Sequence, residues 1–270
     1  MEIAGKRILL TGATGGIGRA IAAALASRGG ALVLSSRKAG ELDQLAADLP
    51  GGGHSAVVSD LAEPGAAVRL AEDASAAGPV DILVANAGLP GSGRLSDFSS
   101  EEVARAVRVN LESPMTLAHA LLPAMVERHE GHLLFVSSLA GKAASPRASV
   151  YNATKFGLRG FALALREDLE GDGSGVGVSV VLPGFIRDAG MFADSGARVP
   201  PGVGTSTPEE VAAGVVSAIE RNRSEVAVAP IQQRAMAHLA HWFPGIAARA
   251  QRGRGTKIAE RVAGGQADKR

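Results

Sequence analysis

The 270-residue sequence has no cysteine, which excludes disulfide bonds, thiolate metal sites and a cysteine nucleophile. Aromatic residues are scarce: one tryptophan and one tyrosine, Tyr151, accompany seven phenylalanines. The first ten residues are too short and too charged for a signal peptide, and no apolar run is long enough to span a bilayer. We therefore expect a soluble, cytoplasmic protein, and the 46% hydrophobic content argues against disorder.

Charge is distributed unevenly along the chain. The net charge is only +1, but residues 231–270 contain eight Lys or Arg residues against two Asp or Glu residues. A basic tail on a mildly acidic body suggests a surface role for that tail, although a solvated, frayed terminus is the simpler interpretation.

Short apolar segments alternate with longer segments of helical character, a pattern typical of a mostly parallel sheet covered by helices on both faces. The expected strands are Arg7–Thr11, Ala31–Ser35, Ser55–Ser59, Asp81–Ala85, His132–Ser137, Val176–Leu182 and Glu225–Ala229. The expected helices are Gly16–Arg28, Ala39–Asp48, Pro64–Ala77, Glu101–Arg128, Ser149–Glu170 and Pro208–Arg221. The pattern predicts one doubly wound α/β domain over residues 1–230, followed by a basic helical extension over 231–270.

A glycine-rich turn, Thr11–Gly18, joins the first expected strand to the first helix. Backbone N–H groups at a helix N-terminus can receive a phosphate only where no side chain blocks its approach. Gly12 permits the turn, Gly16 permits close approach, and Gly18 lets the helix pack on the sheet. This position, at the first strand–helix junction, predicts a nucleotide site.

Tyr151 and Lys155 are four residues apart on an expected helix, so their side chains lie on one face. Ser137 and Ser138 stand at the end of a buried strand, at the sheet edge where doubly wound proteins build their sites. Either serine could face such a site.

The turn spacing T-G-x-x-x-G-x-G, the Y-x-x-x-K pair, the N-A-G run that begins at Asn86 and the P-G pair at Pro183 resemble the short-chain dehydrogenase/reductase family over residues 5–230. The resemblance implies a Rossmann-like fold and an oxidoreductase that interconverts a carbonyl and an alcohol by hydride transfer. Two positions depart from the family pattern: Ala85 replaces an asparagine, and Asp188 stands where a threonine is usual.

The resemblance also implies roles for four residues. Tyr151 would donate the proton in reduction, and Lys155 would tune that phenol and hold the nicotinamide ribose. Ser138 would hydrogen-bond the substrate oxygen together with Tyr151, and Asn110 would anchor a water in a proton relay. The implied cofactor contacts are Gly12, Thr14, Gly16, Ile17, Gly18, Ser36, Arg37, Asp60, Leu61, Asn86, Ala87, Gly88, Tyr151, Lys155, Pro183, Gly184 and Ile186.

The end of the second strand bears on cofactor choice. A carboxylate there would bind the adenosine ribose of NAD and repel a 2′-phosphate, but the sequence has Ser36 and Arg37. A guanidinium binds phosphate oxygens well, so we expect NADP(H) in preference to NAD(H). Alternatives are that Arg37 merely begins a solvated helix, that the protein is an NAD-dependent alcohol or steroid dehydrogenase, or that it senses NADP(H) without turnover.

Three further expectations concern the substrate and partners. The irregular stretch Arg187–Thr207, with Met191 and Phe192, predicts a mobile lid over a largely hydrophobic small-molecule substrate. The apolar residues of Ile231–Phe243 could contact an anionic membrane, cap the substrate pocket or pack on a sister subunit, with packing on protein favoured. His129 and His132 are three residues apart, as are His238 and His241, but neither pair has a third ligand, so we expect no metal. We also expect no nucleic-acid partner. The expected assembly is a homodimer or homotetramer.

Overall fold

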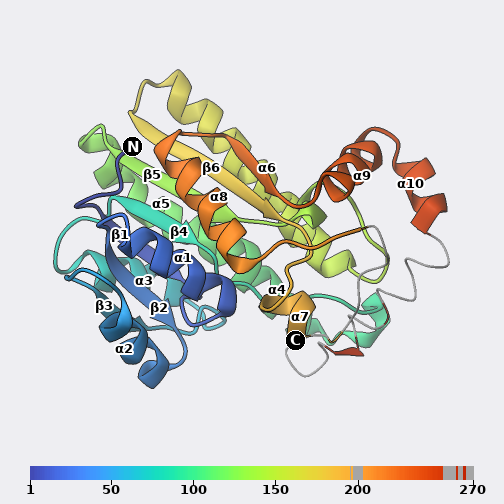
Figure 1. The fold of residues 1–270 in the computed structure, drawn as a ribbon, viewed down its shortest axis with the longest axis horizontal. Helices are drawn as coiled ribbons and strands as arrows, with labels where there is room; N and C mark the ends of the chain where they lie inside the picture. Colours follow the sequence, from blue (N-terminus) through green and yellow to red (C-terminus); the bar gives the residue numbers. More distant parts are fainter. Residues whose placement is uncertain (195, 197–202, 252–259, 261–263, 266–270) are drawn as a thin grey trace.

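The structure is a computed structural model that describes residues 1–194, 196, 203–251, 260 and 264–265. Seven parallel strands form one sheet in the order β3-β2-β1-β4-β5-β6-β7 (Figure 1). They are β1 (Arg7–Thr11), β2 (Ala31–Ser36), β3 (Ser55–Val58), β4 (Ile82–Ala85), β5 (Gly131–Val136), β6 (Val176–Pro183) and β7 (Glu225–Val228). The predicted doubly wound, Rossmann-like fold is confirmed, and each predicted strand is present to within two residues at either end.

Helices cover both faces of this sheet, because each crossover between parallel strands carries its helix onto one face. The longer ones are α1 (Gly16–Ala26), α2 (Ala39–Asp48), α3 (Ala66–Ser75), α4 (Ser100–Val107), α5 (Ser113–Glu127), α6 (Ser149–Gly171) and α8 (Pro208–Glu220). Beyond the sheet follow α9 (Ile231–Trp242) and α10 (Pro244–Gln251), and a short α7 (Gly190–Asp194) precedes α8.

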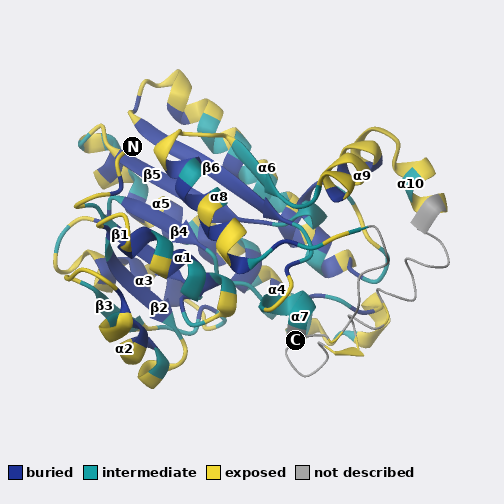
Figure 2. Cartoon of the chain, in the orientation of Figure 1, coloured by how far each residue is buried: buried dark blue, intermediate teal, exposed yellow. Residues whose placement is uncertain are grey.

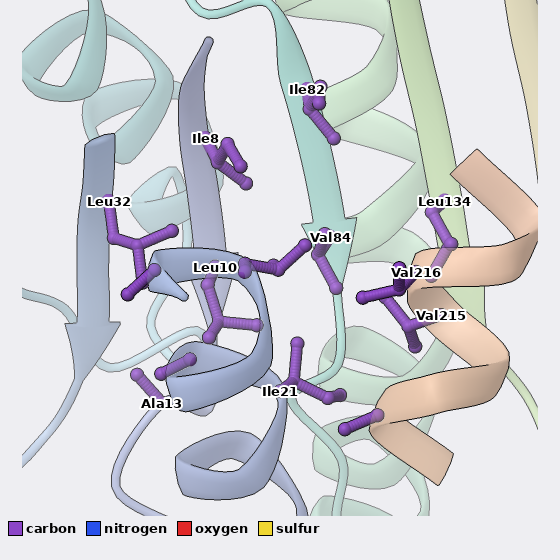
Figure 3. Packing of buried hydrophobic residues seen from close by; sticks show 14 of the residues in the cluster. Ile8, Leu10, Ala13, Ile21, Leu32, Ile82, Val84, Leu134, Val215 and Val216 are labelled. Carbon is purple, nitrogen blue, oxygen red and sulfur yellow. The ribbon is translucent and has the colours of Figure 1, made fainter. Parts of the chain in front are cut away.

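Successive side chains of each strand point to opposite faces of the sheet, and they form one hydrophobic core on each face. Ile8 and Leu10 of β1 point into the core beneath α1 and α8, whereas Leu9 between them points into the core beneath α3, α5 and α6. Figure 3 shows the first core, in which Ile21 of α1 and Val215 of α8 meet the strand side chains. The five central strands are buried on both faces, as the dark blue ribbons in Figure 2 show, whereas the edge strands β3 and β7 are only partly buried.

The predicted helix Glu101–Arg128 differs from the structure in one respect. A π-helical turn, Arg108–Glu112, separates α4 from α5. Such a turn inserts one extra residue into the helix, and it often occurs at a functional position. Here it contains the buried Asn110, one of the predicted site residues.

Candidate active site

A cavity of about 1070 Å³ opens at the carboxyl ends of the strands, where the strand order reverses between β1 and β4. All seventeen residues predicted to contact a cofactor line it, as does Ser138. Asn110 does not line the cavity but lies fully buried beside it. The fold therefore brings together predicted cofactor residues that are up to 174 positions apart in the sequence, from Gly12 to Ile186.

The glycine turn has the backbone geometry that a phosphate site requires. Gly12 adopts a φ of +66°, and a Cβ there would lie 2.9 Å from the Cα of Ala87. A Cβ on Gly18 would clash with the Gly12 carbonyl oxygen, so α1 can pack against the turn only because this residue is glycine. No side chain caps the N-terminus of α1, which leaves its first N–H groups and positive dipole end facing the cavity. These residues fit the pyrophosphate of a dinucleotide.

Thr11, which the sequence analysis did not single out as a site residue, fixes this turn to β4. Its hydroxyl accepts hydrogen bonds from the backbone N–H groups of Asn86 and Ala87, each at 3.0 Å. The Asn86 side chain returns a 3.0 Å hydrogen bond to the Thr11 carbonyl. The signal was present in the sequence, since Thr11 is the first letter of the turn motif.

At the far end of the cavity, Arg37 follows β2 and lies 3.8 Å from the carboxylate of Asp60. Both side chains are partly exposed, 53% for Arg37 and 39% for Asp60, so the pair is weak and the guanidinium is accessible from the cavity. The Ser36 hydroxyl accepts a hydrogen bond from the backbone of Lys38. No carboxylate stands at the end of β2 itself.

Tyr151 and Lys155 lie one turn apart near the start of α6. The Lys155 ammonium group is 5.8 Å from the centre of the Tyr151 ring and donates a 3.0 Å hydrogen bond to the Val136 carbonyl. Burial lowers the pKa of Lys155 to about 8. Burial raises the pKa of Tyr151, and a hydrogen bond with Ser138 opposes that rise. In the protein without a cofactor, the net effect of burial and this hydrogen bond is therefore a raised phenol pKa.

The two candidate serines have different partners. The Ser137 hydroxyl donates a hydrogen bond to the Lys155 backbone carbonyl at 2.9 Å and is buried. The Ser138 hydroxyl bonds the side chain of Tyr151 and lies 3.4 Å from the Pro183 carbonyl. Of the two, Ser138 is the serine that faces the phenol.

Asn110 is held by the backbone of Leu89 in both directions. Its Oδ1 accepts from the Leu89 N–H at 2.7 Å, and its Nδ2 donates to the Leu89 carbonyl at 2.9 Å. The same Nδ2 lies 3.4 Å from the Thr154 hydroxyl, on the helix that carries Tyr151. The π-helical turn therefore connects α6 to the loop after β4.

The predicted lid Arg187–Thr207 lies partly outside the described residues, at 195 and 197–202. Its first part covers the glycine turn, since a Cβ on Gly16 would lie within contact distance of the Ala189 Cβ. The rings of Phe185 and Phe192, tilted by 44° to each other with their centroids 4.7 Å apart, line the same wall of the cavity. Asp188 adopts a φ of +67° with its side chain 72% exposed, beside the Arg187 guanidinium.

Helix α9 closes one side of the cavity, which it lines with Gln233, Met236, Ala237 and Ala240. Gln233 is buried and hydrogen-bonds the backbone just before the predicted lid and near its end: its Oε1 accepts from the Phe185 N–H at 3.1 Å, and its Nε2 donates to the Gly204 carbonyl at 2.9 Å. Gln233 was not among the predicted site residues, because a lone glutamine on an amphipathic helix carries no motif.

Among the described residues, no three His, Asp or Glu side chains gather as metal ligands would. None of the helices in the described part of the chain has the length and apolar character needed to cross a bilayer.

The family model for short chain dehydrogenases matches residues 6–199. The chain therefore belongs to the short-chain dehydrogenase/reductase family of oxidoreductases, as its motifs predicted. It is 38% identical to the ketoacyl reductase HetN of a Nostoc species over 231 residues, which are 84% of this chain and 79% of that protein. It is 36% identical to the mouse dehydrogenase/reductase SDR family member 7B over 187 residues, which are 67% of this chain but 57% of that protein.

Solved structures of the same family superpose closely. A short-chain dehydrogenase of Sphingobium yanoikuyae in complex with NADPH is 28% identical, with a TM-score of 0.77 over 91% of this chain and 94% of that one. A short-chain dehydrogenase/reductase of Burkholderia phymatum in complex with NAD is 26% identical, with a TM-score of 0.79 over 91% of this chain and 96% of that one. A nicotinamide dinucleotide is thus the cofactor class of this fold and site.

Proposed function

We propose that the protein is an NADP(H)-dependent oxidoreductase that interconverts a carbonyl and an alcohol, with Tyr151 as the proton donor in reduction. The observation that carries the proposal is the cluster of Ser138, Tyr151 and the buried Lys155 on the wall of a cavity that begins at a phosphate-binding turn. A phenol, an ammonium group and a hydroxyl around one open volume suit proton transfer to a carbonyl oxygen.

The bound nicotinamide would supply or accept the hydride at the substrate carbon. In reduction, the Tyr151 hydroxyl gives its proton to the substrate oxygen as negative charge develops there, and the Ser138 hydroxyl hydrogen-bonds the same oxygen. Lys155, held by the Val136 carbonyl, stabilises the resulting phenolate through its positive charge. Asn110 anchors a water that returns a proton toward Tyr151 from the solvent. Substrate oxidation runs the same proton transfers in reverse.

The preference for NADP(H) rests on the adenosine end of the cavity. Arg37 offers an accessible guanidinium, and no carboxylate follows β2 to repel a 2′-phosphate. The relatives support either cofactor, since solved structures of the family contain NADPH, NADP or NAD. The charge at Arg37 supports the proposal of NADP(H).

The substrate side of the cavity suits an apolar molecule. Its wall includes Leu139, Phe185, Met191, Phe192 and Ala237. A ketoacyl reductase is among the relatives, so ketoacyl thioesters are a reasonable carbonyl class beside simple ketones and aldehydes. We propose that one side of α9 forms a wall of the substrate cavity, through Gln233, Met236, Ala237 and Ala240.

The test is a cofactor-linked screen of apolar ketones, aldehydes and ketoacyl thioesters with NADPH and with NADH, followed by nicotinamide absorbance. We expect turnover with at least one of these classes and a higher kcat/KM for NADPH. Tight NADPH binding without turnover of any class would favour a sensor instead. A higher kcat/KM with NADH would overturn the cofactor assignment while leaving the reaction class intact.

A further inference from the structure

The helices after the sheet expose an unusual amount of apolar surface. Among the described residues, twelve large apolar side chains are exposed, and half of them lie within the sixteen residues from Ile231 to Ile246. They are Ile231, Met236, Leu239, Trp242, Phe243 and Ile246, and the indole of Trp242, the chain's only tryptophan, is the most exposed at 73%. We call this set the α9–α10 apolar face. A patch of this kind, gathered on one part of a protein, marks an interaction surface.

The position of the face in the fold leaves it open. Helices α9 and α10 project from the body on the side away from β3 (Figure 1), and Figure 2 shows α9 mostly in the colour of exposed residues. Of the residues of α9, only Gln233, Ala237 and Ala240 are buried, and these three residues line the cavity. The large apolar side chains were expected to pack on protein, but within this chain α9 uses its small residues for that contact.

The charge around the face points to one kind of partner. Residues 231–259 contain five Arg or Lys residues and no Asp or Glu residue. Arg234 and Arg249 are exposed on the same two helices as the apolar side chains. Aromatic and aliphatic side chains interspersed with arginines suit a surface with an apolar interior and anionic headgroups. A second copy of the face would instead bring like charges together, which disfavours a symmetric pair.

We infer that α9 and α10 form a docking surface for an anionic lipid bilayer, on which the protein lies without crossing it. Met236 belongs both to the exposed face and to the rim of the substrate cavity. Docking through this face therefore brings the cavity to the membrane surface, where an apolar carbonyl substrate partitions. The inference goes beyond the proposed reaction, and its test does not use turnover.

The experiment measures binding of the full-length protein to vesicles of phosphatidylcholine alone and of phosphatidylcholine with phosphatidylglycerol. Co-sedimentation gives the bound fraction. The emission of Trp242 reports on the face directly, because the chain has no other tryptophan. We expect binding to the anionic vesicles, a shift of the emission to shorter wavelength, and loss of binding at high salt.

Two variants remove the two parts of the surface. Leu239→Gln/Phe243→Gln retains Trp242 as reporter and should abolish the emission shift, because the apolar side chains no longer insert. Arg234→Gln/Arg249→Gln should weaken binding to anionic vesicles roughly fivefold for each arginine removed. The matched controls are Val68→Gln/Leu95→Gln, which changes exposed apolar residues elsewhere, and Arg69→Gln on α3. Both controls should bind as the wild type does.

Two results would overturn the inference. One is the absence of binding to anionic vesicles, or binding that the α9 variants leave unchanged. The other is a wild-type dimer that sedimentation shows to dissociate in Leu239→Gln/Phe243→Gln while neither protein binds vesicles, because the face would then belong to a sister subunit. None of the substituted residues lines the cavity, so failure of the membrane inference and failure of the proposed reductase activity can be told apart.

Discussion

The Lys155 ammonium group lies 5.8 Å from the centre of the Tyr151 ring, and burial shifts the pKa of each group toward its neutral form. Burial lowers the pKa of the lysine to about 8 and raises the pKa of the phenol. Without a cofactor, Tyr151 is therefore a weaker acid than a free phenol, and it lies beside an ammonium group whose charged form is destabilised by burial. A positive nicotinamide next to both groups would favour the phenolate, which ties proton transfer to the presence of the oxidised cofactor.

The cost of burying Lys155 predicts a stabilising substitution. A pKa lowered from 10.5 to about 8 corresponds to a penalty on the order of 3 kcal/mol for the charged form at neutral pH, and loss of the bond to Val136 offsets about 1 kcal/mol of the gain. Lys155→Met should raise the Tm at neutral pH by roughly 2–6 °C and lose activity. Differential scanning fluorimetry and a turnover assay measure both.

The sign of the pH dependence follows from the same shift. Between about pH 8 and 10.5 the unfolded chain binds more protons at this lysine than the folded protein, so the wild type gains stability as the pH rises through that window. The stability advantage of Lys155→Met over the wild type, measured as the difference in Tm, should therefore shrink as the pH rises through that window. Lys142→Met is the contrasting control, because that buried lysine is paired with Glu225 at 2.6 Å and its removal should lower the Tm. A Lys155→Met protein less stable than Lys142→Met would contradict the assignment.

Arg37 should control the choice between the two dinucleotides. Arg37→Asp replaces a phosphate-binding guanidinium with a carboxylate that repels a 2′-phosphate and can accept bonds from ribose hydroxyls. We expect NADPH affinity to fall at least about tenfold and NADH affinity to hold or rise. Titration of intrinsic fluorescence or calorimetry gives both dissociation constants. Arg69→Asp, on α3 away from the cavity, should change neither, and equal losses for both dinucleotides in Arg37→Asp would sink the proposal.

Gln233 should hold the predicted lid against α9 through its hydrogen bonds to the backbone at Phe185 and Gly204. Gln233→Ala removes the bonds to Phe185 and Gly204, so the segment between them loses its attachment to α9. We expect faster tryptic cleavage after Arg187 and a severalfold higher KM for the carbonyl substrate. The dissociation constant for NADPH should change less than the KM. The neighbouring Gln232 is exposed, so Gln232→Ala is the matched control, and identical proteolysis of the two variants would refute the role of Gln233.

The buried His132 predicts sensitivity to acid. Burial lowers its pKa to about 3, and its ring bonds the Ser179 hydroxyl at 2.9 Å. Between about pH 6.5 and 3 the unfolded chain binds more protons at this histidine, so the folded state loses stability as the pH falls. The loss should be on the order of 2–3 kcal/mol from neutral pH to about pH 4.5. Urea unfolding at both pH values should show a smaller loss in His132→Gln, and equal losses would exclude His132 as the source.

The site residues differ in how far the sequence could predict them. Tyr151 and Lys155 were accessible because helical spacing places them on one face, and the glycine turn because only glycine fits its backbone. The choice of Ser138 over Ser137 needed the structure, since both end the same strand and differ only in their partners. Gln233 and the π-helical turn at Asn110 were not predictable, because their contacts are with backbone groups distant in sequence.

The central claim is that Tyr151 donates the proton to the substrate, and the direct measurement is single-turnover oxidation of NADPH by Tyr151→Phe beside the wild type. The ring is kept and only the hydroxyl is lost, so NADPH should bind within about threefold of the wild-type affinity. The rate of the chemical step should fall by roughly 10²–10⁴-fold. A single-turnover rate close to that of the wild type, with NADPH bound normally, would contradict the mechanism.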